Sequence, residues 1–159
     1  MKNKNGISAI VATVLIILIT VAAVTIIWAA IIPMISNQLE SGTICLDAVS
    51  QVQLLDSGYT CKVVNATSTG YNISLQVKHG AKAFVLAGLQ VLISEGGSTT
   101  PYELTTNLPG SNEEKVLEIL NYANTTVAGP DKIQIAPIVT VGNTQESCDI
   151  SATKTLTVC

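Results

Sequence analysis

The chain has 159 residues, of which 48% are hydrophobic and only 12% are charged, with a formal net charge of −3. It contains eight lysines and no arginine. Proteins that bind nucleic acid or anionic lipid headgroups need clustered basic side chains, so this composition excludes both functions for the chain.

An apolar segment without any charged side chain, residues 8–35, follows a short leader with the sequence MKNKNG. As a helix rising 1.5 Å per residue, this segment measures about 40 Å, more than the bilayer core of about 30 Å. We therefore expect one long hydrophobic helix over residues 7–41. Pro33 lacks an amide hydrogen, so it should bend or weaken this helix. Trp28 is either a membrane-interface anchor or a packed contact in an assembly.

The distribution of lysine predicts the orientation of this helix. Lys2 and Lys4 precede the apolar segment, and the next lysine is Lys62. By the positive-inside rule, the N-terminus stays in the cytoplasm and the remainder of the chain is exported. Without the leader, six lysines stand against eleven acidic residues, a net charge of −5.

Residues 42–159 form a second region, of the size of one ordinary domain. Short apolar segments separated by turn residues predict strands over residues 45–55, 61–64, 71–78, 84–94, 113–122, 133–141 and 153–158. The segment 113–122 could also form a short amphipathic helix, but its place between turns favours a strand. Gly88 predicts a bulge or a bend within its strand. We expect an α+β protein, in which the long helix precedes an Ig-like antiparallel β-sandwich.

Four cysteines, Cys45, Cys61, Cys148 and Cys159, lie in this second region. An even number outside a membrane segment predicts disulfides in an oxidising compartment. Zinc is disfavoured because 15 and 10 residues separate the successive pairs, where zinc sites usually have two to four. Three pairings are possible. We expect Cys45–Cys61 and Cys148–Cys159, since each pair flanks a predicted hairpin.

Three N-x-S/T sequons are present, at Asn65, Asn72 and Asn124. Asn, Ser and Thr are also common turn residues, so the motifs alone do not establish modification. Export of this region favours N-glycosylation at one or more of them.

The sequence contains no recognisable catalytic motif. It has no P-loop, no G-x-S-x-G and no dinucleotide-binding glycine motif. The single histidine, His79, precedes a glycine and is expected to be a solvated turn residue. We expect no enzymatic activity, no cofactor and no metal site.

A secretory signal peptide has an apolar stretch of 7–15 residues, about half of the length found here. An uncleaved signal anchor would explain the helix alone. However, the segment KNKNG-ISAIVATVLIILITVAAVTIIWAAIIPMI resembles the class III signal and N-terminal helix of archaeal type IV pilins. The resemblance implies that a prepilin peptidase removes residues 1–6 by cutting between Gly6 and Ile7. Bacterial relatives carry a glutamate where this chain has Val11, which favours the archaeal branch.

The resemblance also implies a function. Such a chain is inserted in the membrane first and is then assembled, by the pilus machinery, into a homo-oligomeric helical filament outside the cell. The helices form the filament core, and the heads, residues 42–159, form its surface. Adhesion or surface attachment is the expected role, and an archaellin subunit of a motility filament belongs to the same class. The alternative is a single-pass membrane anchor carrying an extracellular binding domain.

Overall fold

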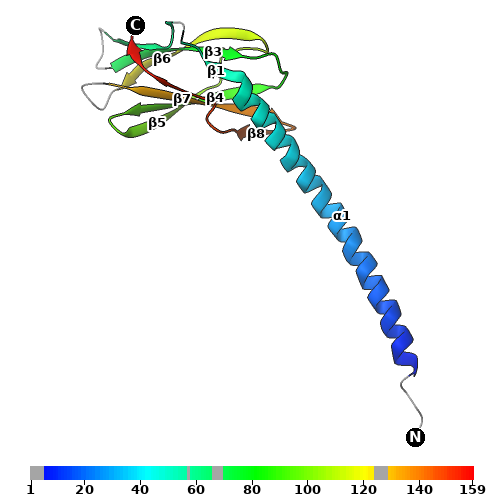
Figure 1. The fold of residues 1–159 in the computed structure, drawn as a ribbon. Coiled ribbons are helices and arrows are strands. Elements are labelled where there is room, and N and C mark those ends of the chain that lie inside the picture. The colour runs from blue at the N-terminus through cyan, green and yellow to red at the C-terminus, as the bar shows by residue number, and fades with distance from the viewer. Residues whose placement is uncertain (1–5, 57, 66–69, 124–128) are drawn as a thin grey trace. The chain divides into compact units, whose positions relative to one another are not determined.

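The computed structural model describes residues 6–56, 58–65, 70–123 and 129–159, with side chains from Ala9 onward. Within these ranges, the chain forms one helix followed by ten strands, nearly all paired antiparallel (Figure 1). This arrangement confirms the predicted α+β class. The chain divides into two compact units, Met1–Glu40 and Ser41–Cys159, and the helix contributes residues to both.

The helix α1 (Gly6–Gln51) has 46 residues and continues through Pro33. The predicted end near residue 41 is therefore wrong, and so is most of the predicted strand over residues 45–55, of which only Val52–Leu54 forms a strand. Ile44, Cys45, Ala48 and Val49 recur at helical spacing and pack against Val139, Val141, Cys148 and Phe84 of the β-region. This apolar stripe is buried only if the segment is helical, so tertiary packing decides its conformation.

The first sheet is centred on β3. Its strands are β1 (Val52–Leu54), β2 (Cys61–Val64), β3 (Gly70–His79), β6 (Glu113–Ala123) and β10 (Thr157–Val158). Along one edge, β3 pairs with β6; along the other, it pairs with β1 and then β2. β10 extends the sheet by pairing parallel with β2.

The second sheet is centred on β4 and β7. Its strands are β4 (Leu86–Glu95), β5 (Ser98–Leu104), β7 (Lys132–Val141), β8 (Thr144–Ser147) and β9 (Ala152–Thr155). β5, β4 and β7 are neighbours in that order, and β8 and β9 pair in succession with the outer edge of β7. Gly96 and Gly97 both have positive φ, as the two-residue turn between β4 and β5 requires.

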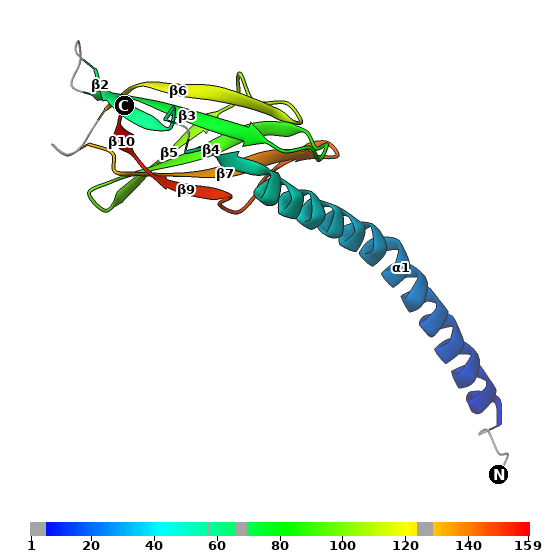
Figure 2. The same cartoon turned by 45° about the horizontal axis from the view of Figure 1, so that its top comes forward.

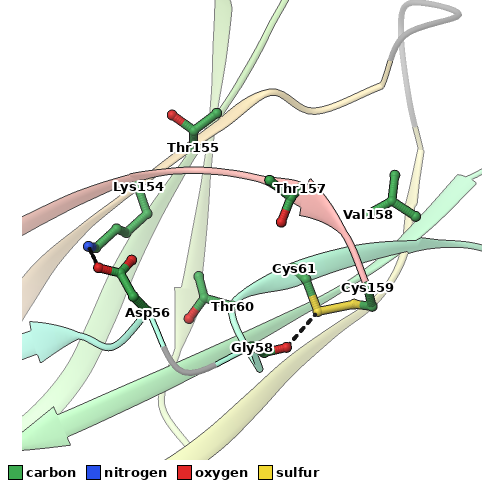
Figure 3. Close-up of a pocket in the computed structure, with 9 residues that line it drawn as sticks. All are labelled: Asp56, Gly58, Thr60, Cys61, Lys154, Thr155, Thr157, Val158 and Cys159. Carbon is green, nitrogen blue, oxygen red and sulfur yellow. Dashed lines mark hydrogen bonds and ion pairs between the residues drawn. A yellow bond between two sulfur atoms is a disulfide. The ribbon is translucent and has the colours of Figure 1, made fainter.

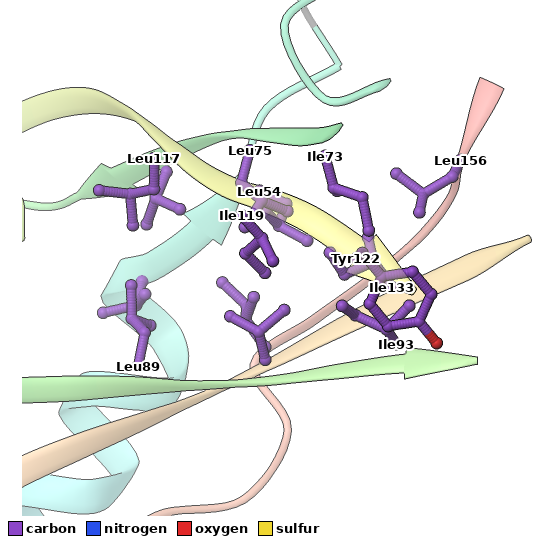
Figure 4. Packing of buried hydrophobic residues seen from close by; sticks show 14 residues of the cluster. Leu54, Ile73, Leu75, Leu89, Ile93, Leu117, Ile119, Tyr122, Ile133 and Leu156 are labelled. Carbon is purple, nitrogen blue, oxygen red and sulfur yellow. The ribbon is translucent and has the colours of Figure 1, made fainter. Parts of the chain in front are cut away.

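The two sheets form two layers with an aliphatic core between them (Figures 1 and 2). Ile73, Leu75 and Val77 of β3 are fully buried in this core. Figure 4 shows Ile73 and Leu75 between the layers, with Leu89 of the second sheet across the core. The alternation of these residues with Asn72, Ser74, Gln76 and Lys78 is why β3 could be predicted.

Most strand predictions are confirmed, including β6 over the ambiguous segment 113–122. The bulge at Gly88 is confirmed by a register shift between Leu86 and Gly88. The predicted strand over residues 153–158 is two strands, which pair with different sheets. Two strands, β5 and β8, escaped prediction because their residues are mostly exposed and polar and β5 contains Pro101. The Ig-like topology stays a prediction.

Candidate functional site: an exposed apolar helix surface

The feature of the unit Met1–Glu40 that most needs a partner is its apolar surface. Large hydrophobic side chains are exposed along α1 from Ile10 to Ile35, with Ile10 70% and Trp28 65% exposed. They follow one another without a polar face, so the helix is apolar all round rather than amphipathic. Covering one such side chain yields about 1.5–3 kcal/mol, so an uncovered surface of this length is unstable in water.

The three threonine hydroxyl groups within this surface are satisfied by the helix itself. The Oγ1 atoms of Thr13, Thr20 and Thr25 each donate a hydrogen bond of 2.9 Å to the carbonyl three residues earlier. No charged residue occurs between Ala9 and Leu39. The surface therefore fits an environment that excludes water, and it loses little by leaving water.

Two environments meet this requirement. The helix is long and apolar enough to cross a membrane. It also carries small side chains that permit close contact between helices, at Ala9, Ala12, Ala22, Ala23, Ala29 and Ala30. The bend expected at Pro33 stays a prediction. The apolar helix indicates a membrane span or a signal sequence.

The predicted processing site lies at the start of this helix. Gly6 is the first residue of α1, and Ile7 follows within it. The remaining leader residues, 1–5, lie outside the described residues. Cleavage between Gly6 and Ile7 stays a prediction.

Two disulfides are formed, but the predicted pairing is wrong. The bridges join Cys45 to Cys148 and Cys61 to Cys159, across Cα–Cα distances of 5.3 and 5.2 Å. Cys45 lies in the part of α1 that packs beside Cys148. Cys61 is brought to the chain end because β10 pairs with β2, and the Cys159 N–H donates to the Lys62 carbonyl. The disulfides indicate an extracellular location for this region.

Two of the three sequon asparagines, Asn65 and Asn72, lie near one end of the first sheet. Asn65 follows β2, and Asn72 lies near the start of β3. Asn124 lies outside the described residues. Asn121 of β6 forms hydrogen bonds with both Asn65 and Asn72. Its backbone N–H donates to Asn72 Oδ1 at 3.0 Å, and its Oδ1 accepts from Asn65 Nδ2 at 2.6 Å. No sequence motif predicts these hydrogen bonds, because they depend on the pairing of β3 with β6.

His79 is the last residue of β3 and is only 1% exposed, so its expected role as a solvated turn residue is wrong. Its Nδ1 lies 3.2 Å from the Pro109 carbonyl, and its ring contacts Phe84 with centroids 4.3 Å apart. Because the carbonyl can only accept, Nδ1 carries the proton in this contact. The side chain acts as a core residue.

Other buried polar groups were not anticipated from the sequence. Lys62 is buried, donates to the Pro130 carbonyl at 2.6 Å, and lies over the Tyr71 ring. Burial raises the pKa of the Tyr122 hydroxyl, and the nearby Glu95 carboxylate, which accepts its hydrogen bond at 3.4 Å, adds to this effect. These contacts connect the first sheet to Glu95 of β4 and to Pro130, which precedes β7 in the second sheet.

The Glu113 carboxylate, at the turn before β6, forms a hydrogen bond within that turn. The pKa of the Glu113 carboxyl is lowered because the Gly110 N–H donates to its Oε2 at 2.7 Å and because Lys115 is near. This contact closes the turn that leads into β6. The exposed carboxylate therefore has a structural partner.

A shallow hollow of 370 Å³ lies beside the Cys61–Cys159 bridge (Figure 3). Asp56 and Lys154 lie on its wall, and Lys154 Nζ is 2.5 Å from Asp56 Oδ2. Their opposite charges are paired with each other, and threonines supply most of the other polar side chains. Within the described residues, no three His, Cys, Asp or Glu side chains gather where they could hold a metal ion.

Comparisons with protein-family models, with curated protein sequences and with solved structures gave no match for this chain. The functional interpretation consequently depends on the residues and their geometry.

Proposed function

We propose that this chain is a structural subunit of an extracellular filament of the archaeal type IV pilus kind. In this proposal, the apolar part of α1 packs with the same segment of other copies, and the disulfide-bonded heads cover the resulting helical core. Before assembly, the helix lies in the membrane. A prepilin peptidase removes the leader before Ile7, and the filament serves adhesion or surface attachment.

The observation that carries this proposal is the apolar surface of α1 between Ile10 and Ile35. As a helix, these residues extend over about 39 Å, whereas a bilayer core is about 30 Å thick. A filament core would cover the entire segment, including the part beyond one bilayer thickness. The alanines would lie where neighbouring helices approach closely, since small side chains permit backbone proximity.

The same helix also supports a second candidate, a membrane-anchored extracellular domain. This alternative needs only one apolar span, which α1 satisfies by length and composition. The two candidates differ in what surrounds α1 in its final state, which is protein in the filament and lipid in the anchor. They can therefore be separated by a substitution that lipid tolerates and helix packing does not.

Replacing Ala22 and Ala23 together by leucine makes that distinction. The change keeps the segment apolar, so membrane insertion is retained. The added side chains prevent close approach of neighbouring helices, so we expect filaments on the cell surface to be lost in electron micrographs. The matched control is Ile26→Leu, which changes shape at nearly constant volume and should leave filaments intact.

N-terminal sequencing of surface material completes the experiment. We expect assembled protein to begin at Ile7. Filaments of normal appearance from the Ala22→Leu, Ala23→Leu variant would contradict packing of this helix in a filament core. If the unaltered protein remains monomeric in the membrane and retains Met1, the anchored domain is correct instead.

A further inference from the structure

The outer face of the first sheet carries an asparagine between two exposed aliphatic side chains. Asn72 pairs directly with Val63 of β2, and paired residues of neighbouring strands point to the same face. On the other side, the register of β3 with β6 shifts between Tyr71 and Ile73, which leaves Leu120 and Asn121 opposite Asn72. Val63 is 45% exposed and Leu120 is 59% exposed.

Only the oxygen of the Asn72 side-chain amide forms a hydrogen bond with a described residue. The Asn121 N–H donates to Asn72 Oδ1 at 3.0 Å, so the carbonyl oxygen of this amide faces the bulge in β6. Among the described residues, Asn72 Nδ2 has no hydrogen-bond partner. At the neighbouring sequon, in contrast, Asn65 Nδ2 already donates to Asn121 Oδ1 at 2.6 Å. Ser74, the third residue of the Asn72 sequon, lies on the same face of β3, which has a period of two.

We propose that Asn72 carries an N-linked glycan whose first sugar covers Val63 and Leu120. This inference rests on one part of the proposed function, the export of the head, and does not need assembly into a filament. The sequon supplies the acceptor, Asn121 orients the amide, and the two aliphatic side chains offer an apolar surface to the C–H face of a sugar ring. Covering them removes an exposed apolar strip from the outer surface of the head.

The chemistry is a glycosyl transfer. Asn72 Nδ2 forms a bond to the anomeric carbon of an oligosaccharide carried on a lipid phosphate. The bond between that carbon and the phosphate oxygen breaks, and the lipid phosphate leaves with the electron pair. Nδ2 gives up one proton to a base of the transferase, and no oxidant or reductant takes part. The remaining Nδ2 proton and the bond from Asn121 to Oδ1 are compatible with the folded sheet.

The first test is mass spectrometry of the full-length protein purified from its native cells. Trypsin leaves Asn65 and Asn72 in one peptide, residues 63–78, and chymotrypsin separates them by cleaving after Tyr71. We expect a glycan on the fragment that contains Asn72, and its loss in Ser74→Ala. An unmodified Asn72 in assembled filaments would overturn this inference and leave the filament standing. A glycosylated Asn72 on a membrane-bound monomer would support it while contradicting the filament.

The second test concerns the position of the sugar. Hydroxyl-radical footprinting of the detergent-solubilised full chain reports the exposure of Val63 and Leu120. We expect their oxidation rates to rise severalfold in Ser74→Ala, with Val158, 70% exposed, as an unchanged reference. Asn72→Asp, which keeps the acceptor for the Asn121 N–H but cannot be glycosylated, should give the same rise. Thr67→Ala, which removes only the Asn65 sequon, should not. Unchanged rates in both glycan-free variants would overturn the covering role.

Discussion

The two disulfides overlap in sequence, and this overlap makes a quantitative prediction about the stability of the head. Each bridge spans about a hundred residues, with sequence separations of 103 and 98. In the chain-entropy description, a bridge that closes a loop of this length stabilises the folded state by about 4.7 kcal/mol. When the other bridge is intact, however, a shorter covalent circuit already exists.

That circuit runs along residues 45–61 and 148–159, so it contains about 27 residues, for which the same relation gives about 3.5 kcal/mol. Replacing Cys45 and Cys148 by serine, or Cys61 and Cys159 by serine, should therefore lower the free energy of unfolding by about 3.5 kcal/mol in each case. Replacing all four should lower it by about 8 kcal/mol, more than twice the single effect. This loss is comparable with the whole stability of many domains, about 5–15 kcal/mol.

Hydrogen exchange of the backbone amides in β4 and β7, measured on the full chain in detergent, reports the free energy of opening the head. Digestion with trypsin provides the covalent check. Because the tryptic peptide that ends at Lys62 contains both Cys45 and Cys61, the observed pairing should yield a single assembly of three peptides. Two separate disulfide species, together with strictly additive losses of about 3 kcal/mol each, would refute the reasoning and restore local pairing.

Two further predictions concern the core of the head. Leu75→Ala removes a fully buried side chain and should lower the free energy of unfolding by about 2–5 kcal/mol, whereas Val85→Ala, at a 65% exposed position, should change it by less than about 0.5 kcal/mol in the same exchange experiment. The pKa of Tyr122 is raised in the folded state. Its contribution to the free energy of unfolding is therefore fully present below the pKa of an unfolded tyrosine, about 10, and is lost as the pH rises through the pKa of the folded state. We expect the stability of the head to fall above about pH 10 and to fall less in Tyr122→Phe; the same alkaline loss in both proteins would contradict this assignment.

Local pattern was sufficient where one face of a segment is buried. Ile73, Leu75 and Val77 alternate with polar residues, so β3 could be predicted from its period, and the continuous apolar segment after Gly6 likewise predicted a long helix. The bulge at Gly88 followed from a glycine inside an apolar strand. The apolar helix surface, which carries the proposed function, is thus readable from the sequence, because a single apolar segment of this length satisfies its backbone groups within a membrane only as a helix.

Tertiary structure decided the rest, since those features depend on residues distant in the sequence. Residues 45–51 contain apolar side chains compatible with either period, and packing against Val139 makes them helical. The same packing places Cys45 beside Cys148, while the parallel pairing of β10 with β2 places Cys159 beside Cys61. The Asn121 contact that orients Asn72 exists only because β6 pairs with β3 through a register shift. Sequence periodicity reports which face of an element is buried, but not which other element covers it.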